Sequence, residues 1–262
     1  MSDTVEITMD QRGVARLLIN NPEKHNILSP DTIAGLTEAA DRLGNDPAVR
    51  VVVLTGSGKS FCAGGDLGWM QMAMNADHDT RNAEARKLAT MLQALNTLPK
   101  PLIGRINGQA YGGGVGMLSV CDVAIGIRGA RFGLTETKLG VIPATISPYV
   151  LARMGEDKAR RVFMSSRLFE AEEAVTLNLL AKVVEPDDLD EAVEAEIRPY
   201  LRCAPGAVAD SKALARALGP VIDDKVIDMT VASLVDRWES DEIKEGLAAF
   251  FEKRDANWVL RD

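Results

Sequence analysis

The sequence predicts an α/β fold in which parallel strands alternate with helices, followed by a helical C-terminal region. Through the first half of the chain, short apolar runs alternate with segments whose apolar residues recur every three or four positions. From about Ser147 onward the strand pattern nearly vanishes, and only 181–184 looks extended. A chain of 262 residues that is 46% hydrophobic is long enough for one large domain with a substantial core.

The first strand-helix-strand unit is predicted from three neighbouring segments. Val14–Ile19 is apolar and follows a turn signal that ends at Gly13, and 51–54 is β-branched and followed by Thr-Gly. Between them, Ser29 and a proline precede apolar residues at helical spacing from Ile33 to Leu43. These features predict a βαβ unit with parallel strands.

The pattern repeats and then becomes helical. Segment 81–98 has helical spacing, 101–106 and 123–127 are strand-like, and a short helix led by glycines lies between the two strands. The later segments with helical periodicity are 147–154, 156–164, 171–180, 188–201, 207–218, 226–238 and 241–256. Segment 66–80 has polar stretches and several Met and Trp residues, so we predict a mobile loop or irregular helix there, a candidate lid.

Charge and cysteine content exclude several classes of protein. The net charge of -8 argues against a nucleic-acid binder, because phosphate contacts need clustered Lys and Arg. Cys62, Cys121 and Cys203 are odd in number and too far apart for a zinc site, which predicts no disulfide framework and no metal. The N-terminus lacks an apolar leader and no run is long enough to span a membrane, so we expect a cytoplasmic protein.

Three motifs follow predicted strands at the edge where parallel sheets bind ligands. They are 21–26 (NPEKHN), 61–66 (FCAGGD) and 108–116 (GQAYGGGVG). Residues without a side chain let backbone N–H groups turn toward a ligand oxygen, and a helix that starts near Gly112 adds the positive end of its dipole. Two such N–H groups form an oxyanion hole.

In this order, the motifs resemble the crotonase (enoyl-CoA hydratase/isomerase) superfamily. NPEKHNIL, SFCAGGDL, INGQAYGGGVGM, CDVAI, RFGLTETKLGVIP and FFEKR match its pattern over essentially the whole chain. The resemblance implies a spiral of ββα units, with an acyl-CoA-binding core over 1–195 and a helical region over 196–262 for trimerisation and pocket closure. It also implies a homotrimer or a dimer of trimers, with the terminal helices around 238–258 at a subunit boundary.

The resemblance carries site residues onto this chain. The N–H groups of Gly65 and Gly113 would stabilise a thioester enolate. Lys24 and Lys253 correspond to positions that meet CoA phosphates. The implied CoA- and substrate-binding set is Lys24, His25, Ala63, Gly64, Asp66, Leu67 and Lys253. Because CoA is part of the substrate, no separate cofactor is expected.

The acid-base group departs from the family pattern. Typical hydratases of this family have one Glu two residues after the glycine triplet and another in the following GxxE segment. This chain has Gly116 and Glu136 at those positions, so one expected carboxylate is missing. A lone Glu136 permits hydration of an enoyl-CoA, but it also resembles the arrangement in the family's double-bond isomerases. A binding-only relative, a hydrolase and a decarboxylase stay open.

Segment 139–148 is similar to family members that hydrate 3-methylglutaconyl-CoA in leucine degradation, and it favours a hydratase over an isomerase. More general members act in fatty acid metabolism. A methylglutaconyl substrate carries a distal carboxylate, and we expect Lys138 to bind it if the segment around Glu136 is extended, because alternate residues of a strand share a face.

Overall fold

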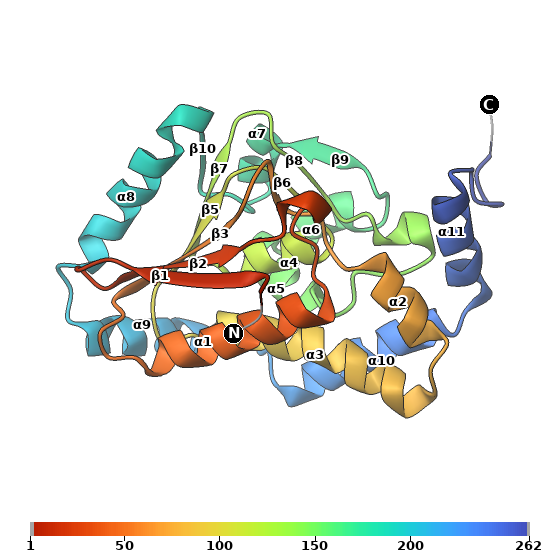
Figure 1. Cartoon of the computed structure of the whole chain (residues 1–262), viewed down its shortest axis with the longest axis horizontal. Coiled ribbons are helices and arrows are strands. Elements are labelled where there is room, and N and C mark those ends of the chain that lie inside the picture. Colours follow the sequence, from red (N-terminus) through yellow and green to blue (C-terminus); the bar gives the residue numbers. More distant parts are fainter. Residues whose placement is uncertain (1–2, 261–262) are drawn as a thin grey trace.

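Two β-sheets form the centre of the structure, a computed structural model that describes residues 3–260 (Figure 1). The larger sheet has the order β1-β2-β3-β5-β7-β10 and the smaller one β4-β6-β8-β9. The strands are β1 Val5–Met9, β2 Val14–Ile19, β3 Val51–Gly56, β4 Ser60–Cys62, β5 Leu102–Ile106, β6 Gln109–Tyr111, β7 Val123–Ile127, β8 Arg131–Gly133, β9 Leu168–Glu170 and β10 Lys182–Val184.

The chain winds as a spiral because successive strand pairs feed both sheets. β3, β5 and β7 enter the larger sheet, and the strand that follows each of them, β4, β6 and β8, enters the smaller sheet. The pairs β2–β3, β3–β5 and β5–β7 are parallel, as are β4–β6 and β6–β8. This arrangement confirms the predicted spiral of ββα units.

Helices cover the sheets and fill the C-terminal region. α1, α3 and α10 lie side by side along one edge of the molecule, and α8 covers the opposite face of the larger sheet (Figure 1). The helices are α1 Pro30–Asn45, α2 Leu67–Met74, α3 His78–Asn96, α4 Gly113–Val120, α5 Ser147–Met154, α6 Glu156–Phe163, α7 Ala171–Thr176, α8 Leu189–Tyr200, α9 Pro205–Leu218, α10 Asp224–Trp238 and α11 Asp241–Glu252, with short 3-10 helices η1 Pro22–Lys24, η2 Glu136–Leu139 and η3 Pro186–Asp188.

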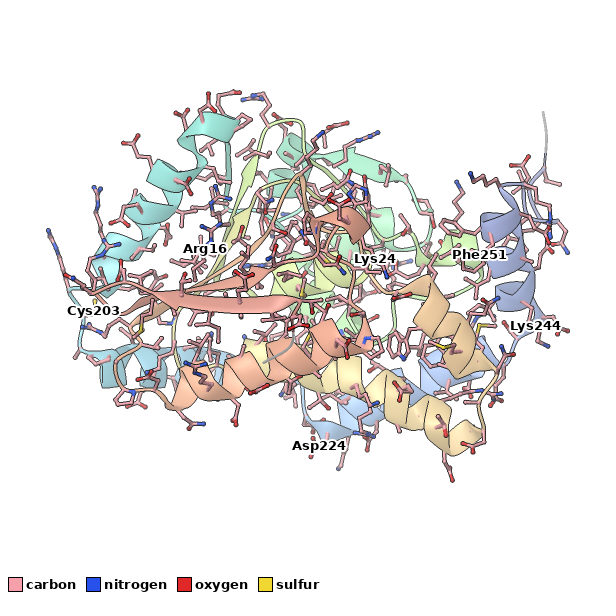
Figure 2. The ribbon with its side chains drawn as sticks, in the orientation of Figure 1. Arg16, Lys24, Cys203, Asp224, Lys244 and Phe251 are labelled. Carbon is pink, nitrogen blue, oxygen red and sulfur yellow. The ribbon has the colours of Figure 1, made fainter. Side chains whose placement is uncertain are left out.

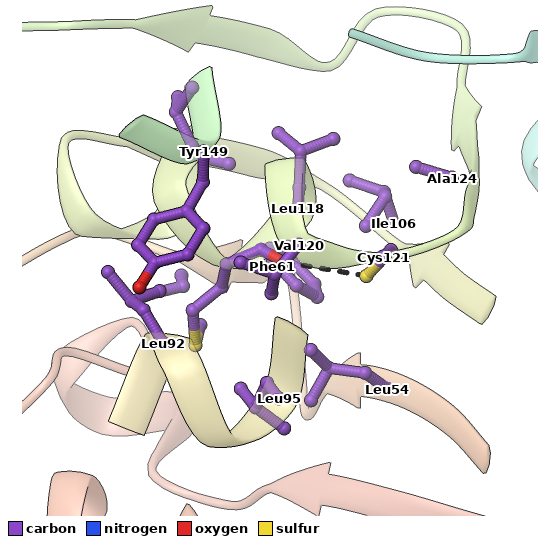
Figure 3. Close-up of a cluster of buried hydrophobic side chains, with 14 of the residues drawn as sticks. Leu54, Phe61, Leu92, Leu95, Ile106, Leu118, Val120, Cys121, Ala124 and Tyr149 are labelled. Carbon is purple, nitrogen blue, oxygen red and sulfur yellow. Dashed lines mark hydrogen bonds between the residues drawn. The ribbon is translucent and has the colours of Figure 1, made fainter. Parts of the chain in front are cut away.

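Each central strand is buried on both faces, which explains why its sequence is a continuous apolar run. On β3, Val52 and Leu54 pack into the main core, whereas Val51 and Val53 pack against α8. A strand buried on both faces has no polar side, which is the expected sequence of a parallel strand under helices. Figure 3 shows part of the main core, where Tyr149, Leu92 and Leu118 lie among other buried apolar side chains. The Tyr149 hydroxyl donates a hydrogen bond to Gln93 Oε1 at 3.1 Å.

Most predicted helices are present, and the differences have local causes. α1 begins after Ser29, whose Oγ accepts a hydrogen bond from the Thr32 N–H, as the sequence predicted. The helix predicted over 171–180 is wrong at its end, because α7 stops at Thr176 and Asn178 takes a left-handed conformation (φ 63°). The three-residue strands of the smaller sheet were not predicted, because segments this short show no periodicity.

The candidate lid 66–80 contains the whole of α2 and the first residues of α3. Asp66 caps α2, and Asp77 caps α3 with its carboxylate accepting from the Thr80 N–H. The predicted boundary after residue 195 falls inside α8, which packs on the larger sheet. Within residues 3–260, no helix is long and apolar enough to cross a membrane.

Candidate active site

All ten residues assigned to the site from the sequence line one cavity of about 860 Å³. They come from η1 and the residue after it, the segment that leads from β4 into α2, the start of α4, the start of η2 and the end of α11. Figure 2 labels Lys24 and Phe251, which stand on two walls of this cavity. The ten residues are Lys24, His25, Ala63, Gly64, Gly65, Asp66, Leu67, Gly113, Glu136 and Lys253. A second cavity of about 930 Å³, beside α9, contains none of them.

Strand pairing brings the two candidate oxyanion donors together. β4 and β6 are parallel, with Cys62 opposite Ala110, so the residues three positions further on, Gly65 and Gly113, lie side by side. A Cβ built on Gly113 would lie 3.8 Å from the Gly65 nitrogen. Among the hydrogen bonds made by residues 3–260, neither the Gly65 nor the Gly113 N–H has an acceptor.

The N–H of Gly113 is also one of the unpaired donors at the start of a helix. Gly113 is the first residue of α4, and the preceding Gly112 has a positive φ of 48°. The aligned peptide dipoles of α4 place partial positive charge at this end, where an anion is stabilised. The site is therefore built to bind an oxygen that gains negative charge.

Two positions next to the donors require glycine. Gly64 has φ 97°, and a Cβ there would lie 2.8 Å from the Tyr111 carbonyl oxygen. A Cβ on Gly112 would lie 2.9 Å from Glu136 Oε1. Any side chain at these positions would push apart β4, α4 and the carboxyl group that stand around the site.

Glu136 places one carboxyl group against the start of α4. β8 pairs with β6, and the Gly112 N–H donates to the Gly133 carbonyl at 2.9 Å, which fixes the turn that leads into Glu136. Glu136 Oε2 is buried and has no hydrogen-bond partner among the described residues. Burial raises the pKa of Glu136 to about 7, because the charged form loses its hydration.

The place of the absent second carboxylate is filled by an apolar side chain. Gly116 lies on α4, and a Cβ built there would meet Ile146 Cγ2 at 2.4 Å and Ile146 Cβ at 2.8 Å. Ile146 is 2% exposed and belongs to the main core. Position 116 therefore has no room for a glutamate side chain unless Ile146 moves.

Several predicted binding residues have structural contacts of their own. The Asp66 carboxylate caps α2, with its Oδ1 accepting from the N–H groups of Gly68 at 2.8 Å and Trp69 at 3.1 Å. His25 Nδ1 lies 3.0 Å from Ser60 Oγ. Lys253 ends α11 in a left-handed conformation, and its side chain is exposed at the cavity mouth.

The role predicted for Lys138 required an extended segment around Glu136, and the segment is not extended. Residues 136–139 form the 3-10 helix η2 rather than a strand, so Lys138 and Glu136 do not share a face. Lys138 is exposed, whereas the Glu136 carboxyl is buried, although both residues line the cavity.

α10 contributes one wall of the cavity, which was not predicted from the sequence. Trp238 is 2% exposed and packs against Trp69 with the rings T-shaped and 6.4 Å apart, and both line the cavity. Trp238 is buried within its own chain, where α10 packs on α3, and the subunit boundary expected around 238–258 stays a prediction. The apolar spacing of 226–238 indicated a buried face, but not which cavity that face would meet.

A family model, a curated relative and solved structures each match this chain over nearly its whole length. The family model for enoyl-CoA hydratase/isomerase matches residues 9–261. The crotonyl-CoA hydratase of Syntrophomonas wolfei is 32% identical over 253 residues, which are 96% of each chain. An enoyl-CoA hydratase structure from Mycobacterium avium has a TM-score of 0.84 at 32% identity and covers 99% of this chain and 100% of its own. One from Shewanella pealeana has a TM-score of 0.80 at 34% identity, with 98% and 97% covered.

Proposed function

We propose that this chain, which belongs to the enoyl-CoA hydratase/isomerase family, adds water across the C2=C3 bond of an enoyl-CoA thioester. One observation carries the proposal. Two backbone N–H groups without acceptors, those of Gly65 and Gly113, share a cavity with the buried carboxyl group of Glu136. This is the arrangement that a thioester enolate needs, with donors at its oxygen and a proton carrier near its carbons.

In the proposed reaction, the two backbone N–H groups bind the thioester oxygen, and Glu136 first accepts a proton and then donates it. The thioester oxygen accepts hydrogen bonds from Gly65 and Gly113, which makes C3 more electrophilic. The Glu136 carboxylate takes a proton from water as the water oxygen bonds to C3, and electrons move to the thioester oxygen. Glu136 then returns that proton to C2, and the thioester carbonyl re-forms. A pKa of about 7 suits a group that must first accept and then donate a proton near neutral pH.

A double-bond isomerase is the second candidate, and the packing at Gly116 favours it. Ile146 fills the place of the second carboxylate, so Glu136 would act alone, as in moving a proton between C2 and C4. Such a transfer needs no water, whereas hydration does. The product therefore distinguishes the two activities.

The decisive experiment measures hydration and isomerisation with the same enzyme samples. Wild type and Glu136→Gln are incubated with crotonyl-CoA, and loss of the enoyl-thioester absorbance is followed; 3-hexenoyl-CoA is the isomerase substrate. We expect wild type to hydrate crotonyl-CoA and the variant to be about 100- to 10,000-fold slower, the usual contribution of a general acid-base group. Isomerisation without hydration would replace the hydratase proposal, and turnover of neither substrate would favour a binding-only relative.

The narrower substrate that we propose is 3-methylglutaconyl-CoA, tested beside crotonyl-CoA. The resemblance of 139–148 supports it. A kcat/KM for crotonyl-CoA that equals or exceeds that for 3-methylglutaconyl-CoA would contradict this narrower substrate. The exposed Lys24 and Lys253 at the same mouth are proposed to meet the CoA phosphates.

We also propose a homotrimer or a dimer of trimers. Phe250 and Phe251 on α11 are 54% and 49% exposed, and Leu218 on α9 is 80% exposed, so apolar side chains of the C-terminal region lack cover in the single chain. Light scattering after gel filtration measures the mass directly; a monomer at micromolar concentration would contradict the assembly.

A further inference from the structure

One wall of the active-site cavity carries a hydrogen-bond donor without a partner. Trp238 lines the cavity from α10, and its Nε1 is buried with no acceptor among residues 3–260. Trp69 stands beside it, but the Trp69 Nε1 donates to Glu84 Oε2 at 2.9 Å. Of these two indole N–H groups, only that of Trp238 is free.

The surroundings of Trp238 make this free donor unusual. Its ring belongs to an apolar cluster that includes Leu234, Leu247 and Val141, with Leu139 and Ile142 packed against it. Buried polar groups in proteins are nearly always hydrogen-bonded, since a buried donor without an acceptor is destabilising. A phenylalanine would fill such a wall without that cost, so the donor calls for an acceptor that arrives with the ligand.

We propose that the Trp238 N–H binds an oxygen atom carried by the acyl chain of the substrate, beyond the reacting C2 and C3. The inference rests on the proposed function, because the same cavity holds Gly65, Gly113 and Glu136 at the thioester end. It names a substrate class, enoyl-CoA esters whose chain bears a hydrogen-bond acceptor, and it makes Trp238 a specificity-determining residue.

The residues that line the cavity indicate whether that oxygen is charged or uncharged. The cations that line it, Lys24, Lys138, Lys253 and Arg254, are all exposed. None belongs to the buried cluster around Trp238. A carboxylate placed against the indole would be buried without a cation, which is costly. An uncharged oxygen such as a hydroxyl therefore suits this wall better than the distal carboxylate of 3-methylglutaconyl-CoA, so this inference and the narrower substrate proposed above predict different preferences. The experiment includes both kinds of acceptor.

The test compares three acyl chains on wild type and Trp238→Phe. The substrates are 2-hexenoyl-CoA, 5-hydroxy-2-hexenoyl-CoA, which adds one oxygen to the same skeleton, and 3-methylglutaconyl-CoA, which carries a carboxylate. We expect wild type to prefer the hydroxylated chain in kcat/KM and Trp238→Phe to lose about 5- to 100-fold of that preference, the usual range for one buried hydrogen bond. Trp69→Phe is the matched control, because it removes an indole N–H that is already bonded, and it should change both hexenoyl substrates by the same factor.

A preference that is equal in wild type and Trp238→Phe overturns the proposal. If only the carboxylate substrate loses rate in Trp238→Phe, the acceptor is charged and the preference for an uncharged oxygen is wrong.

A binding measurement separates this inference from the proposed function. Hexanoyl-CoA and 5-hydroxyhexanoyl-CoA are saturated and cannot be hydrated, so their Kd values report the Trp238 contact even if no substrate turns over. In wild type labelled with 15N-tryptophan there are three indole N–H signals. We expect the Trp238 signal to move downfield with 5-hydroxyhexanoyl-CoA and much less with hexanoyl-CoA. Identical shifts with the two ligands would refute the contact, and this readout needs no variant to fold.

Discussion

Replacing Glu136 with glutamine should stabilise the folded protein increasingly as the pH rises. Burial raises the pKa of Glu136 to about 7, from an ordinary value of 4.5. Between these two values the folded state holds a proton that the unfolded state has released, so wild-type stability falls as the pH rises. Below pH 4.5 both states are protonated and the penalty is absent. Above pH 7 both are ionised, and the folded state carries the full cost of burying the charge.

The size of the effect follows from the two pKa values. Each pKa unit is worth about 1.4 kcal/mol, so a separation of about 2.5 units amounts to about 3 kcal/mol at high pH. About 2.5 kcal/mol of it should develop between pH 5 and pH 8. Glutamine has nearly the same shape and does not titrate, so the variant escapes this pH dependence.

Urea unfolding at pH 5, 6, 7 and 8, at constant ionic strength and protein concentration, measures the effect. The free energy of unfolding of Glu136→Gln minus that of wild type should rise steadily across this range, with unchanged m-values. Glu191→Gln removes an exposed carboxylate on α8 and controls for the change in net charge. A difference between Glu136→Gln and wild type that is the same at every pH would mean that water reaches the Glu136 carboxyl and that the argument from burial fails.

Three further changes test the packing of the site and of the fold. Gly116→Ala should lower the free energy of unfolding by about 1 to 3 kcal/mol, because the new methyl would lie 2.4 Å from Ile146 Cγ2. Adding Ile146→Ala should recover part of that loss, and simple additivity of the two changes in a double-mutant cycle would contradict the contact. Asp66→Ala should cost about 0.5 to 2 kcal/mol by removing the cap of α2, with faster amide exchange in the first turn of that helix; unchanged exchange there would exclude a capping role. Lys212→Met should cost about 1 to 3 kcal/mol, since Lys212 Nζ lies 2.8 Å from Asp122 Oδ2 in a mostly buried pair, and Lys212→Met with Asp122→Asn should cost less than the single change if the unpaired carboxylate causes the loss.

Local patterns in the sequence determined the parallel strands, most of the helices and the family motifs. Val14–Ile19 and the helix that starts after Ser29 were predicted because apolar spacing and capping act over a few residues. The motif glycines were identified for a similar reason, since a positive φ or a close backbone contact at Gly64 and Gly112 admits no side chain. The sequence also showed that Glu136 stands without the second carboxylate of its relatives.

Tertiary structure alone decided what surrounds these residues. Ile146, thirty positions after Gly116, fills the place of the missing carboxylate, and only the packing of the two segments reveals it. The raised pKa of Glu136 and the free N–H of Trp238 likewise depend on burial by residues distant in the chain. Backbone conformation is set by near neighbours, whereas desolvation and unpaired polar groups are properties of a closed cavity, which no local pattern encodes.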